Sequence, residues 1–235
     1  MNNRSAKKAD PRELPTYNLS EAAHYLRLPE STVRSWSLGG TYRTLDGEEK
    51  RAKPIFQINQ RRPPYLSFFN LVEAYVLASI RRKHKVPMQK VRLALDFVKR
   101  ELSVARPLIE QDFLTNGVDL FVEDYSRRLV NVSKQGQLAL RDLLIDSLKR
   151  IDRDPEGLAV LLSPWVIKPD EPHYLEIDPF RSFGRSVIAG TNIPTEIIAE
   201  RFRGGDSLSH LAEDYSVEIE PLEMAIRWEH RAKAA

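Results

Sequence analysis

The chain of 235 residues contains no cysteine. This absence excludes disulfide bridges, zinc–thiolate sites and catalysis by a thiol, and it fits a protein of the reducing cytoplasm. The sequence has no run of about 18 apolar residues, so we expect no membrane span. The first fifteen residues are basic, but no apolar core follows them, and we therefore expect a disordered arm rather than a secretory signal.

Sequence signatures of catalysis are also absent. There is no His-Glu-x-x-His motif, no G-x-x-x-x-G-K-S/T phosphate loop and no G-x-S-x-G turn. The acidic pairs Glu213–Asp214 and Asp152/Asp154 fit a solvated helix face and a turn. The histidines are scattered along the chain at His24, His84, His173, His210 and His230. We therefore expect no enzyme, no catalytic residue, no metal site and no cofactor.

Charge is divided unevenly along the chain. Residues 1–100 hold 20 Lys and Arg against 9 Asp and Glu, a net +11, whereas residues 101–235 hold 16 against 24, a net −8. A basic surface favours nucleic acid because each neutralised phosphate releases a counterion. The alternative is that these long charged side chains only keep the surface hydrated. The division indicates different partners for the two parts.

Residues 17–36 have the pattern of a helix-turn-helix. Ser20 is a candidate N-cap, and Ala22, Ala23 and Leu26 form an apolar stripe. A turn at 28–30 then leads to a second helix, whose Val33 and Trp36 face inward. Thr32, Arg34 and Ser35 are left facing outward, as entry into the major groove requires. The alternative is a helical hairpin that serves stability alone.

This segment resembles the N-terminal domain of MerR-type regulators and phage excisionases. The residues that match their common pattern are Ser20, Glu21, Ala23, Leu26, Leu28, Thr32, Val33, Arg34 and Trp36. Arg27 replaces the glycine that is usual in the turn, and this adds positive charge. The resemblance implies a DNA-binding domain with a wing and a supporting helix pair.

The residues after Trp36 fit a β-wing. Asp46-Gly47 is a strong turn pair, and Ile55, Phe56 and Ile58 are typical of a strand. Wing cations could straddle a phosphate backbone, although a solvated charged loop is the alternative for each. Helices are expected over 68–83 and from Pro87 to Leu102. The predicted DNA-binding residues are Ser31, Thr32, Arg34, Ser35, Arg43, Lys50, Arg51, Lys53, Arg61 and Arg62.

The middle of the chain predicts a small α/β unit. Residues 118–132 are expected to form a β-hairpin with its turn at 124–127, and residues 137–151 a helix. Residues 158–167 are expected to be a core strand, or else an edge that pairs with a partner. Trp165 would then be an anchor at the interface. A flexible boundary is expected near 168–173 and a weaker one near 103–108.

Residues 183–228 predict a short strand followed by three short helices, which is a helix-turn-helix-like unit. They resemble a short bacterial domain of antitoxins with the signature G-R-P-V-I-x-G-T-R-I-P. The matching residues are Gly184, Arg185, Val187, Ile188, Gly190, Thr191, Ile193, Pro194, Asp214 and Tyr215. Ser186 stands in place of the usual proline and Asn192 in place of the usual arginine. The helices are acidic, so dimerisation or partner binding is favoured over DNA contact.

The sequence therefore predicts an α+β fold, mostly helical. We expect a disordered arm at 1–15, a MerR-like winged helix-turn-helix at 16–103, a small α/β middle domain at 104–168 and an antitoxin-like domain at 173–235. The resemblances imply a homodimeric, cytoplasmic, VapB-type antitoxin and autorepressor that binds operator DNA and a PIN-like ribonuclease toxin. Partner-binding candidates are Trp165, Arg185, Asn192 and Trp228. The alternatives are a MerR-like transcription regulator without a toxin and, from another class, a nuclease.

Overall fold

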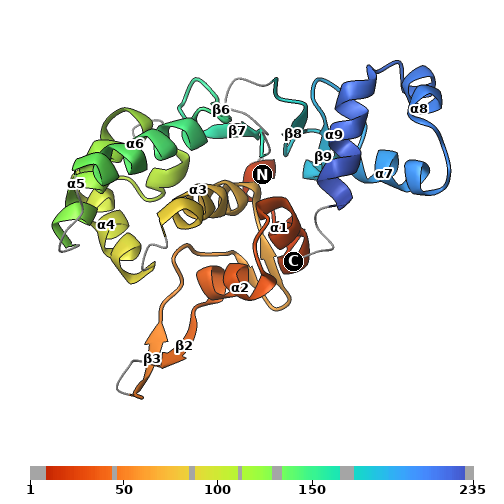
Figure 1. The fold of residues 1–235 in the computed structure, drawn as a ribbon. Coiled ribbons are helices and arrows are strands. Elements are labelled where there is room, and N and C mark those ends of the chain that lie inside the picture. The colour runs from red at the N-terminus through yellow and green to blue at the C-terminus, as the bar shows by residue number, and fades with distance from the viewer. Residues whose placement is uncertain are drawn as a thin grey trace, which may run out of the picture.

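The chain has the predicted mixed α+β fold and is mainly helical (Figure 1). A computed structural model describes residues 9–43, 47–84, 88–110, 113–128, 134–164 and 172–230. A bundle of helices occupies one side, and a small helical unit near the C-terminus occupies the other. A two-stranded hairpin projects from the bottom of the body. Among the described residues, none of the helices combines the length and apolarity needed to cross a membrane.

The predicted helix-turn-helix is present as α1 (Leu19–Leu26) and α2 (Glu30–Leu38). Its N-cap is Asn18 and not Ser20. The Asn18 side chain accepts from the backbone of Glu21 and the Glu21 carboxylate accepts from the backbone of Asn18, so the first turn is closed by a capping box. Leu26, Val33 and Trp36 are buried between the two helices and the body, as their spacing predicts.

The wing consists of β2 (Gly40–Arg43) and β3 (Glu49–Ala52), which pair antiparallel. Gly39 allows the chain to turn sharply out of α2, because its φ is +80° and a Cβ there would lie 2.5 Å from the Ala52 carbonyl oxygen. The strand predicted around Ile55, Phe56 and Ile58 is wrong. Phe56 and Ile58 are each 5% exposed and pack into the core at the base of the wing.

A second small sheet, in the order β1-β5-β4, lies beside α1. It is made of β1 (Tyr17–Asn18), β4 (Gln60–Arg61) and β5 (Pro64–Leu66). The strand β1 runs directly into α1, so this sheet fixes the start of the helix-turn-helix.

The predicted β-hairpin over 118–132 is wrong, since residues 118–128 form a helix. Val118, Phe121, Val122 and Tyr125 recur at helical spacing, and all four are buried. The short η3 (Phe113–Gly117) precedes this helix. The four long helices of the bundle are α3 (Phe68–His84), α4 (Met88–Glu101), α5 (Val118–Arg128) and α6 (Lys134–Leu148). Their core is continuous across residue 103 and includes η2 (Pro107–Ile109).

A four-stranded antiparallel sheet, in the order β6-β7-β8-β9, joins the middle of the chain to its C-terminal part. Its strands are β6 (Ile151–Arg153), β7 (Ala159–Leu162), β8 (Leu175–Ile177) and β9 (Ser186–Ile188). The strand predicted at 158–167 is thus shorter than expected, and residues 165–167 lie outside the described part. Leu162 pairs with Ile177, so hydrogen bonding continues across the predicted boundary at 168–173.

The three predicted C-terminal helices are α7 (Thr195–Arg203), α8 (Leu208–Tyr215) and α9 (Ile219–His230). They enclose a second core that contains Ile198, Leu211, Leu222 and Trp228. The turn η4 (Ser182–Gly184) leads into β9 and lies beside the β1-β5-β4 sheet, because the Tyr17 hydroxyl donates to the Gly184 carbonyl oxygen at 2.9 Å.

The predicted arm at 1–15 is packed where the structure describes it. Residues 1–8 lie outside the described part, and η1 spans Pro11–Glu13. The Arg12 guanidinium bridges Asp10 at 2.8 Å and Asp154 at 2.5 Å, and it also lies over the ring of Phe69. Contact with Asp154, at the turn between β6 and β7, therefore replaces the disorder expected for residues 9–15.

The buried carboxyl group of Glu73 predicts a pH-dependent stability. Glu73 is 6% exposed; it accepts from Asn70 at 3.0 Å and lies 3.9 Å from the Arg106 guanidinium. Burial raises the pKa of Glu73 above its usual value, although Arg106 opposes the shift. The folded protein then binds more protons than the unfolded chain at and above the ordinary carboxyl pKa, so stability falls as pH rises there.

Glu73→Gln removes this titration and keeps an acceptor for Asn70. We expect the free energy of unfolding of the variant, relative to that of the parent, to rise as pH rises from 4.5 towards 7. The rise should be smaller than the cost of removing an aromatic side chain from the core. Urea unfolding midpoints across that range test this. Glu13→Gln is the control, because Glu13 also contacts Arg106 but is half exposed. A stability difference that does not change with pH contradicts the prediction.

Candidate nucleic-acid interface and interdomain junction

The outer face of α2 carries three of the ten predicted contact residues. Ser31 and Arg34 are exposed and Ser35 is half-buried. Thr32 is a correction, because it is 8% exposed and therefore faces the body rather than the solvent. The Arg34 guanidinium pairs with Glu30 one turn earlier, at 3.0 Å, with both side chains about half exposed. Such a pair is weak, so Arg34 can exchange it for a phosphate at little cost.

The wing adds further exposed cations beside α2. Lys50 and Arg51 lie on β3 and Lys53 follows it, and all three are exposed. Lys50 and Arg51 point to opposite faces of the ribbon because they are adjacent in a strand. Lys50 pairs with Glu48 at 3.2 Å, also at the surface. Arg43 ends β2, opposite Glu49.

Arg61 and Arg62 do not belong to this wing. Both are exposed, but they lie in the hairpin between β4 and β5. The sequence analysis assigned both hairpins to one wing, because exposed cations occur in both, at Lys50, Arg51 and Lys53 and again at Arg61 and Arg62. The structure therefore brings Ser31, Arg34 and Ser35 together on α2 and Lys50 and Arg51 together on β3, and it places Arg61 and Arg62 in a different sheet.

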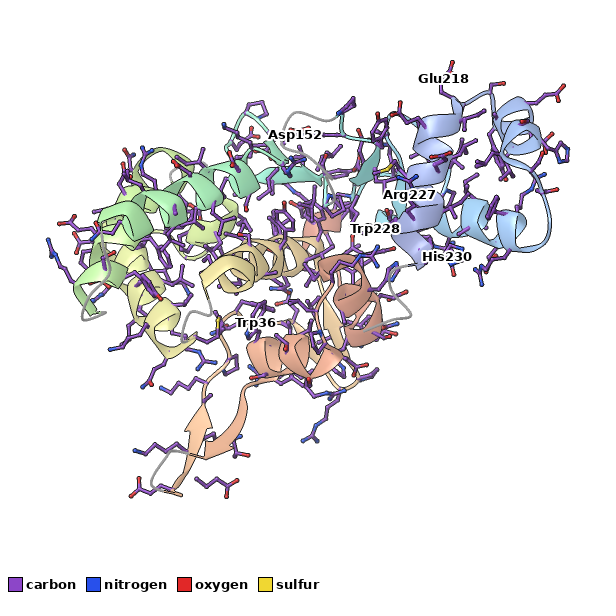
Figure 2. The ribbon with its side chains drawn as sticks, in the orientation of Figure 1. Trp36, Asp152, Glu218, Arg227, Trp228 and His230 are labelled. Atoms are coloured by element: carbon purple, nitrogen blue, oxygen red, sulfur yellow. The ribbon has the colours of Figure 1, made fainter. Side chains whose placement is uncertain are left out.

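The predicted partner-binding residues differ in their exposure to solvent. Trp165 lies outside the described residues. Arg185 and Asn192 are exposed, on either side of β9. Trp228 is a correction: it is 1% exposed and belongs to the C-terminal core. Figure 2 shows Trp228 on the body-facing side of α9 and Glu218 near the other end of that helix, at the edge of the molecule.

Trp228 packs against the helix-turn-helix itself. Its ring stacks on Tyr25 with centroids 6.3 Å apart, and the Arg27 guanidinium lies 4.0 Å from its centroid. Arg27 also donates to the Trp228 carbonyl oxygen. Arg27 is the C-cap of α1, with φ +53° in the left-handed region where glycine is usual. Arg27, the residue that departs from the MerR pattern, therefore joins the turn between α1 and α2 to α9 through its contacts with Trp228.

Polar contacts extend this junction. The Nε2 atom of His24 lies 3.1 Å from Oε2 of Glu229, and the Thr195 hydroxyl donates to Oε1 at 2.5 Å. Burial alone would raise the pKa of Glu229, but the contacts with His24 and Thr195 hold it below its usual value. The Tyr25 hydroxyl accepts from the backbone N–H of Ser186 at 3.2 Å, and burial raises its pKa to about 12.

Two exposed aromatic residues were missed at the sequence level. Phe180 is 57% exposed and Phe183 is 89% exposed, both in the segment that precedes β9. Phe183 has φ +56° and its neighbour Ser182 has φ +45°, so two consecutive L-residues adopt the left-handed conformation. Strain of this kind is concentrated at functional sites. The signal in the sequence was a pair of phenylalanines between arginines and serines, which is also compatible with core packing.

Metal binding has no support in the part of the chain that the structure describes. No three His, Asp or Glu side chains there are close enough to hold an ion. The acidic pairs are separate: Asp154 binds Arg12, whereas Asp214 binds Arg201 at 2.7 Å.

Comparison with known families divides the chain into two matched regions. Residues 15–95 match a family described as "Putative DNA-binding HTH domain". Residues 175–228 match a family described as "Protein of unknown function (DUF433)". The first match covers α1, α2 and the wing, and the second covers the unit that packs on α1.

Similar proteins are found along nearly the whole chain. A protein of Mycobacterium tuberculosis (strain ATCC 25618 / H37Rv) named "Putative antitoxin VapB45" is 27% identical, over 91% of this chain and 93% of its own length. A second protein of the same strain, "Uncharacterized protein Rv2308", is 24% identical, over 93% and 92%. The crystal structure of Rv2018 from M. tuberculosis shares the fold, with a TM-score of 0.64 and 23% identity, covering 91% of this chain and 98% of the other.

Proposed function

We propose that this protein is a DNA-binding antitoxin that neutralises a PIN-like ribonuclease toxin in the cytoplasm and represses its own operon. One observation carries the proposal. The same chain contains a helix-turn-helix with exposed cations and a second unit with exposed aromatic residues. The similarity over 91% of the chain to a protein named as an antitoxin supports this assignment.

DNA binding is assigned to α2 and the wing. The helix α2 enters the major groove with Ser31 and Ser35, while Arg34 on α2 and Lys50 and Arg51 on the wing contact phosphates of the flanking backbone. Helix-turn-helix proteins commonly bind two-fold symmetric operators as dimers, so we propose a homodimer. Light scattering at micromolar concentration tests this, and a monomeric mass contradicts it.

Toxin binding is assigned to the loop that precedes β9, in the unit at 173–235. Phe180 and Phe183 supply apolar contact area, and Arg185 and Asn192 supply polar groups beside them. Aromatic side chains are enriched at protein–protein interfaces, which makes these two exposed rings the candidates for contact with the toxin. This loop and the wing are formed by different segments of the chain, so both ligands can bind at once.

Co-expression tests the proposed function. The tagged chain is expressed with the neighbouring gene, and both co-purification and growth are measured. A small neighbour that co-purifies, and that arrests growth only when this chain is absent, supports the antitoxin. A harmless neighbour that does not co-purify contradicts it.

Phe183→Gly separates partner binding from stability. Glycine relieves the left-handed strain, and a ring that is 89% exposed contributes little burial, so the free energy of unfolding should change by less than about 1 kcal/mol. Toxin affinity should fall at least about tenfold, because an interface anchor is lost. Thermal unfolding and a titration against the toxin measure the two effects.

Leu138→Ala is the matched control for Phe183→Gly. Leu138 is 59% exposed on α6, outside the proposed toxin surface. It should leave toxin affinity unchanged. If both variants lose the same toxin affinity, or if Phe183→Gly binds the toxin as the parent does, the loop is not part of the toxin interface.

A transcription regulator without a toxin is the second candidate. One observation favours it: a cavity of about 660 Å³ adjoins α1 of the helix-turn-helix, and a cavity of that size suits a small ligand. If the protein is a regulator of this kind, it should bind operator DNA, and the product of the neighbouring gene should not co-purify with it.

A further inference from the structure

A second cavity, of about 490 Å³, lies at the base of the wing. The segment 53–57, which follows β3, forms one wall, and α3, α4 and residues 105–106 form the others. Ile55 is half-buried there, and Phe56 and Leu95 are buried. The volume is within the range of small-molecule sites. The cavity therefore has the room and the apolar surface that an organic ligand needs.

Positive charge dominates the lining of this cavity. The charged side chains that line it are Lys53, Arg92, Lys99, Arg106, Glu73 and Asp96. With both carboxylates ionised this is a net charge of +2, from four positive and two negative groups. Lys53 and Lys99 form no ion pair within the part of the chain that the structure describes. The two lysines come from the end of the wing and from α4, so the fold gathers them. Their charge attracts an anion.

The buried carboxyl group of Glu73 provides an independent sign of a ligand. Its Oε2 atom accepts from Asn70 at 3.0 Å, whereas Oε1 makes no hydrogen bond among the described residues and lies 3.9 Å from Nε of Arg106. Oε1 is also not among the unpaired side-chain atoms that are closed off from solvent. Because Glu73 is only 6% exposed and lines the cavity, Oε1 is accessible from the cavity.

The surroundings of Oε1 select the charge of the ligand. Burial raises the pKa of Glu73, although the charges of Arg106 and Lys99 oppose the rise. A neutral carboxyl group keeps an O–H that donates a hydrogen bond. An O–H donor flanked by a guanidinium and an ammonium group is complementary to an oxyanion, whereas the same two cations repel a positively charged ligand.

We propose that this cavity binds a small organic phosphate monoester. Lys53 and Lys99 donate charge-assisted hydrogen bonds to the phosphate oxygens, and the O–H of Glu73 donates a further one. The organic part of the ligand lies against Phe56 and Leu95. A phosphate monoester suits the excess of positive charge better than a carboxylate, because it carries about two negative charges at pH 7.

The ligand lies on the contacts that hold the base of the wing. Asn70 joins Glu73 to the wing, because it also donates to the Gln57 carbonyl oxygen at 2.8 Å. The backbone N–H of Ile55 donates to the carbonyl oxygen of Trp36, near the end of α2, at 2.7 Å. A ligand bound between segment 53–57 and α4 therefore connects the supporting helices to the wing and to α2.

Phenyl phosphate is a suitable probe because it joins a phosphate to an apolar ring. Isothermal titration of the full chain at neutral pH should give saturable binding with a Kd below about 1 mM. Benzoate, a monoanion with the same ring, should bind at least about tenfold more weakly, and benzylamine should not bind. No saturable binding of phenyl phosphate, or equal binding of either control compound, overturns the proposal.

A pair of double variants locates the site. Lys53→Gln with Lys99→Gln should weaken the binding of phenyl phosphate at least about tenfold, since two charge-assisted bonds become neutral ones. The matched control is Lys90→Gln with Lys149→Gln, because these two lysines have the same exposure classes but do not line the cavity. An equal loss in the control pair shows general charge attraction and overturns the proposal.

Glu73→Gln tests the role of the carboxyl group. The amide keeps a donor for the phosphate and removes a negative charge, so the variant should bind phenyl phosphate at least as tightly as the parent. Weaker binding would mean that the carboxylate accepts a hydrogen bond from a positively charged group of the ligand, and this would overturn the assignment of an anion.

Operator DNA distinguishes a small phosphate monoester from a phosphate of the DNA backbone. Saturating phenyl phosphate should not weaken operator binding by the parent, measured by fluorescence anisotropy. Release of the DNA would show that a backbone phosphate occupies the cavity, and the proposal would be overturned. Only this experiment rests on the proposed function. The titrations use no DNA, so failure of the cavity site and failure of DNA binding are distinguishable.

Discussion

Trp228→Ala should lower the free energy of unfolding by about 3–5 kcal/mol, the usual cost of removing a large aromatic residue from a core. The side chain is among the largest that are fully buried, at 1% exposed. Its loss leaves a cavity in the C-terminal core and removes the stacking on Tyr25 and the cation–π contact with Arg27. Urea unfolding monitored by far-UV circular dichroism measures the change.

Ile219→Ala is the control for this variant. Ile219 begins α9, the same helix, but is 44% exposed, so its truncation should cost less than about 1 kcal/mol. A loss below about 1.5 kcal/mol for Trp228→Ala would mean that α9 does not pack on α1 in solution. Trp228 would then be available to a partner, as the sequence alone suggested.

The burial of Trp228 could not be predicted from the resemblance to a family. The antitoxin-like motif identifies a unit of three helices, and the structure contains that unit. The motif says nothing about the surface on which the unit docks. That surface includes Arg27 and His24, which lie about 200 residues earlier in the chain. Contacts between distant segments depend on both partners, so the position of Trp228 could not be inferred from either segment alone.

The error at 118–128 has a different cause. The segment is rich in residues with high β-propensity, including Val118, Phe121, Val122 and Tyr125, and these suggested strands. The same four residues also fit the helical period, and the packing of α5 on α4 and α6 selects the helix. Propensity was therefore overridden by tertiary packing, whereas α1 and α2 were predicted because the spacing of the apolar residues and the turn agreed, although the N-cap is Asn18 and not Ser20.

The candidate site was predicted in part, for a similar reason. Exposure of a cation on a helix follows from spacing, and Arg34 is exposed as expected. Thr32 precedes the buried Val33 and is buried too, since the apolar stripe of a short helix is wide. Phe183 was missed because an exposed phenylalanine leaves the same pattern in a sequence as a buried one.

Replacing Arg34 and Arg51 together by alanine should weaken operator binding at least about tenfold at physiological salt. Each residue offers one cation to a phosphate, from α2 and from the wing respectively. Loss of one phosphate contact lowers the salt dependence of log K by about 0.9, so the double variant should lower the slope by nearly 2. Fluorescence anisotropy with operator DNA, from 50 to 200 mM salt, measures affinity and slope together.

Arg127→Ala is the matched control for the DNA experiment. Arg127 is exposed on α5 and pairs with Glu123 one turn earlier, as Arg34 pairs with Glu30, but it lies in the bundle away from the wing (Figure 1). It should change neither affinity nor slope. Weaker binding of the double variant with an unchanged slope would indicate altered folding rather than lost phosphate contacts. Unchanged affinity and slope would remove α2 and the wing from the DNA interface and would favour the hydrated-surface explanation of the basic half. Because thermal unfolding of the double variant should match that of the parent, affinity and salt slope read together decide between these outcomes.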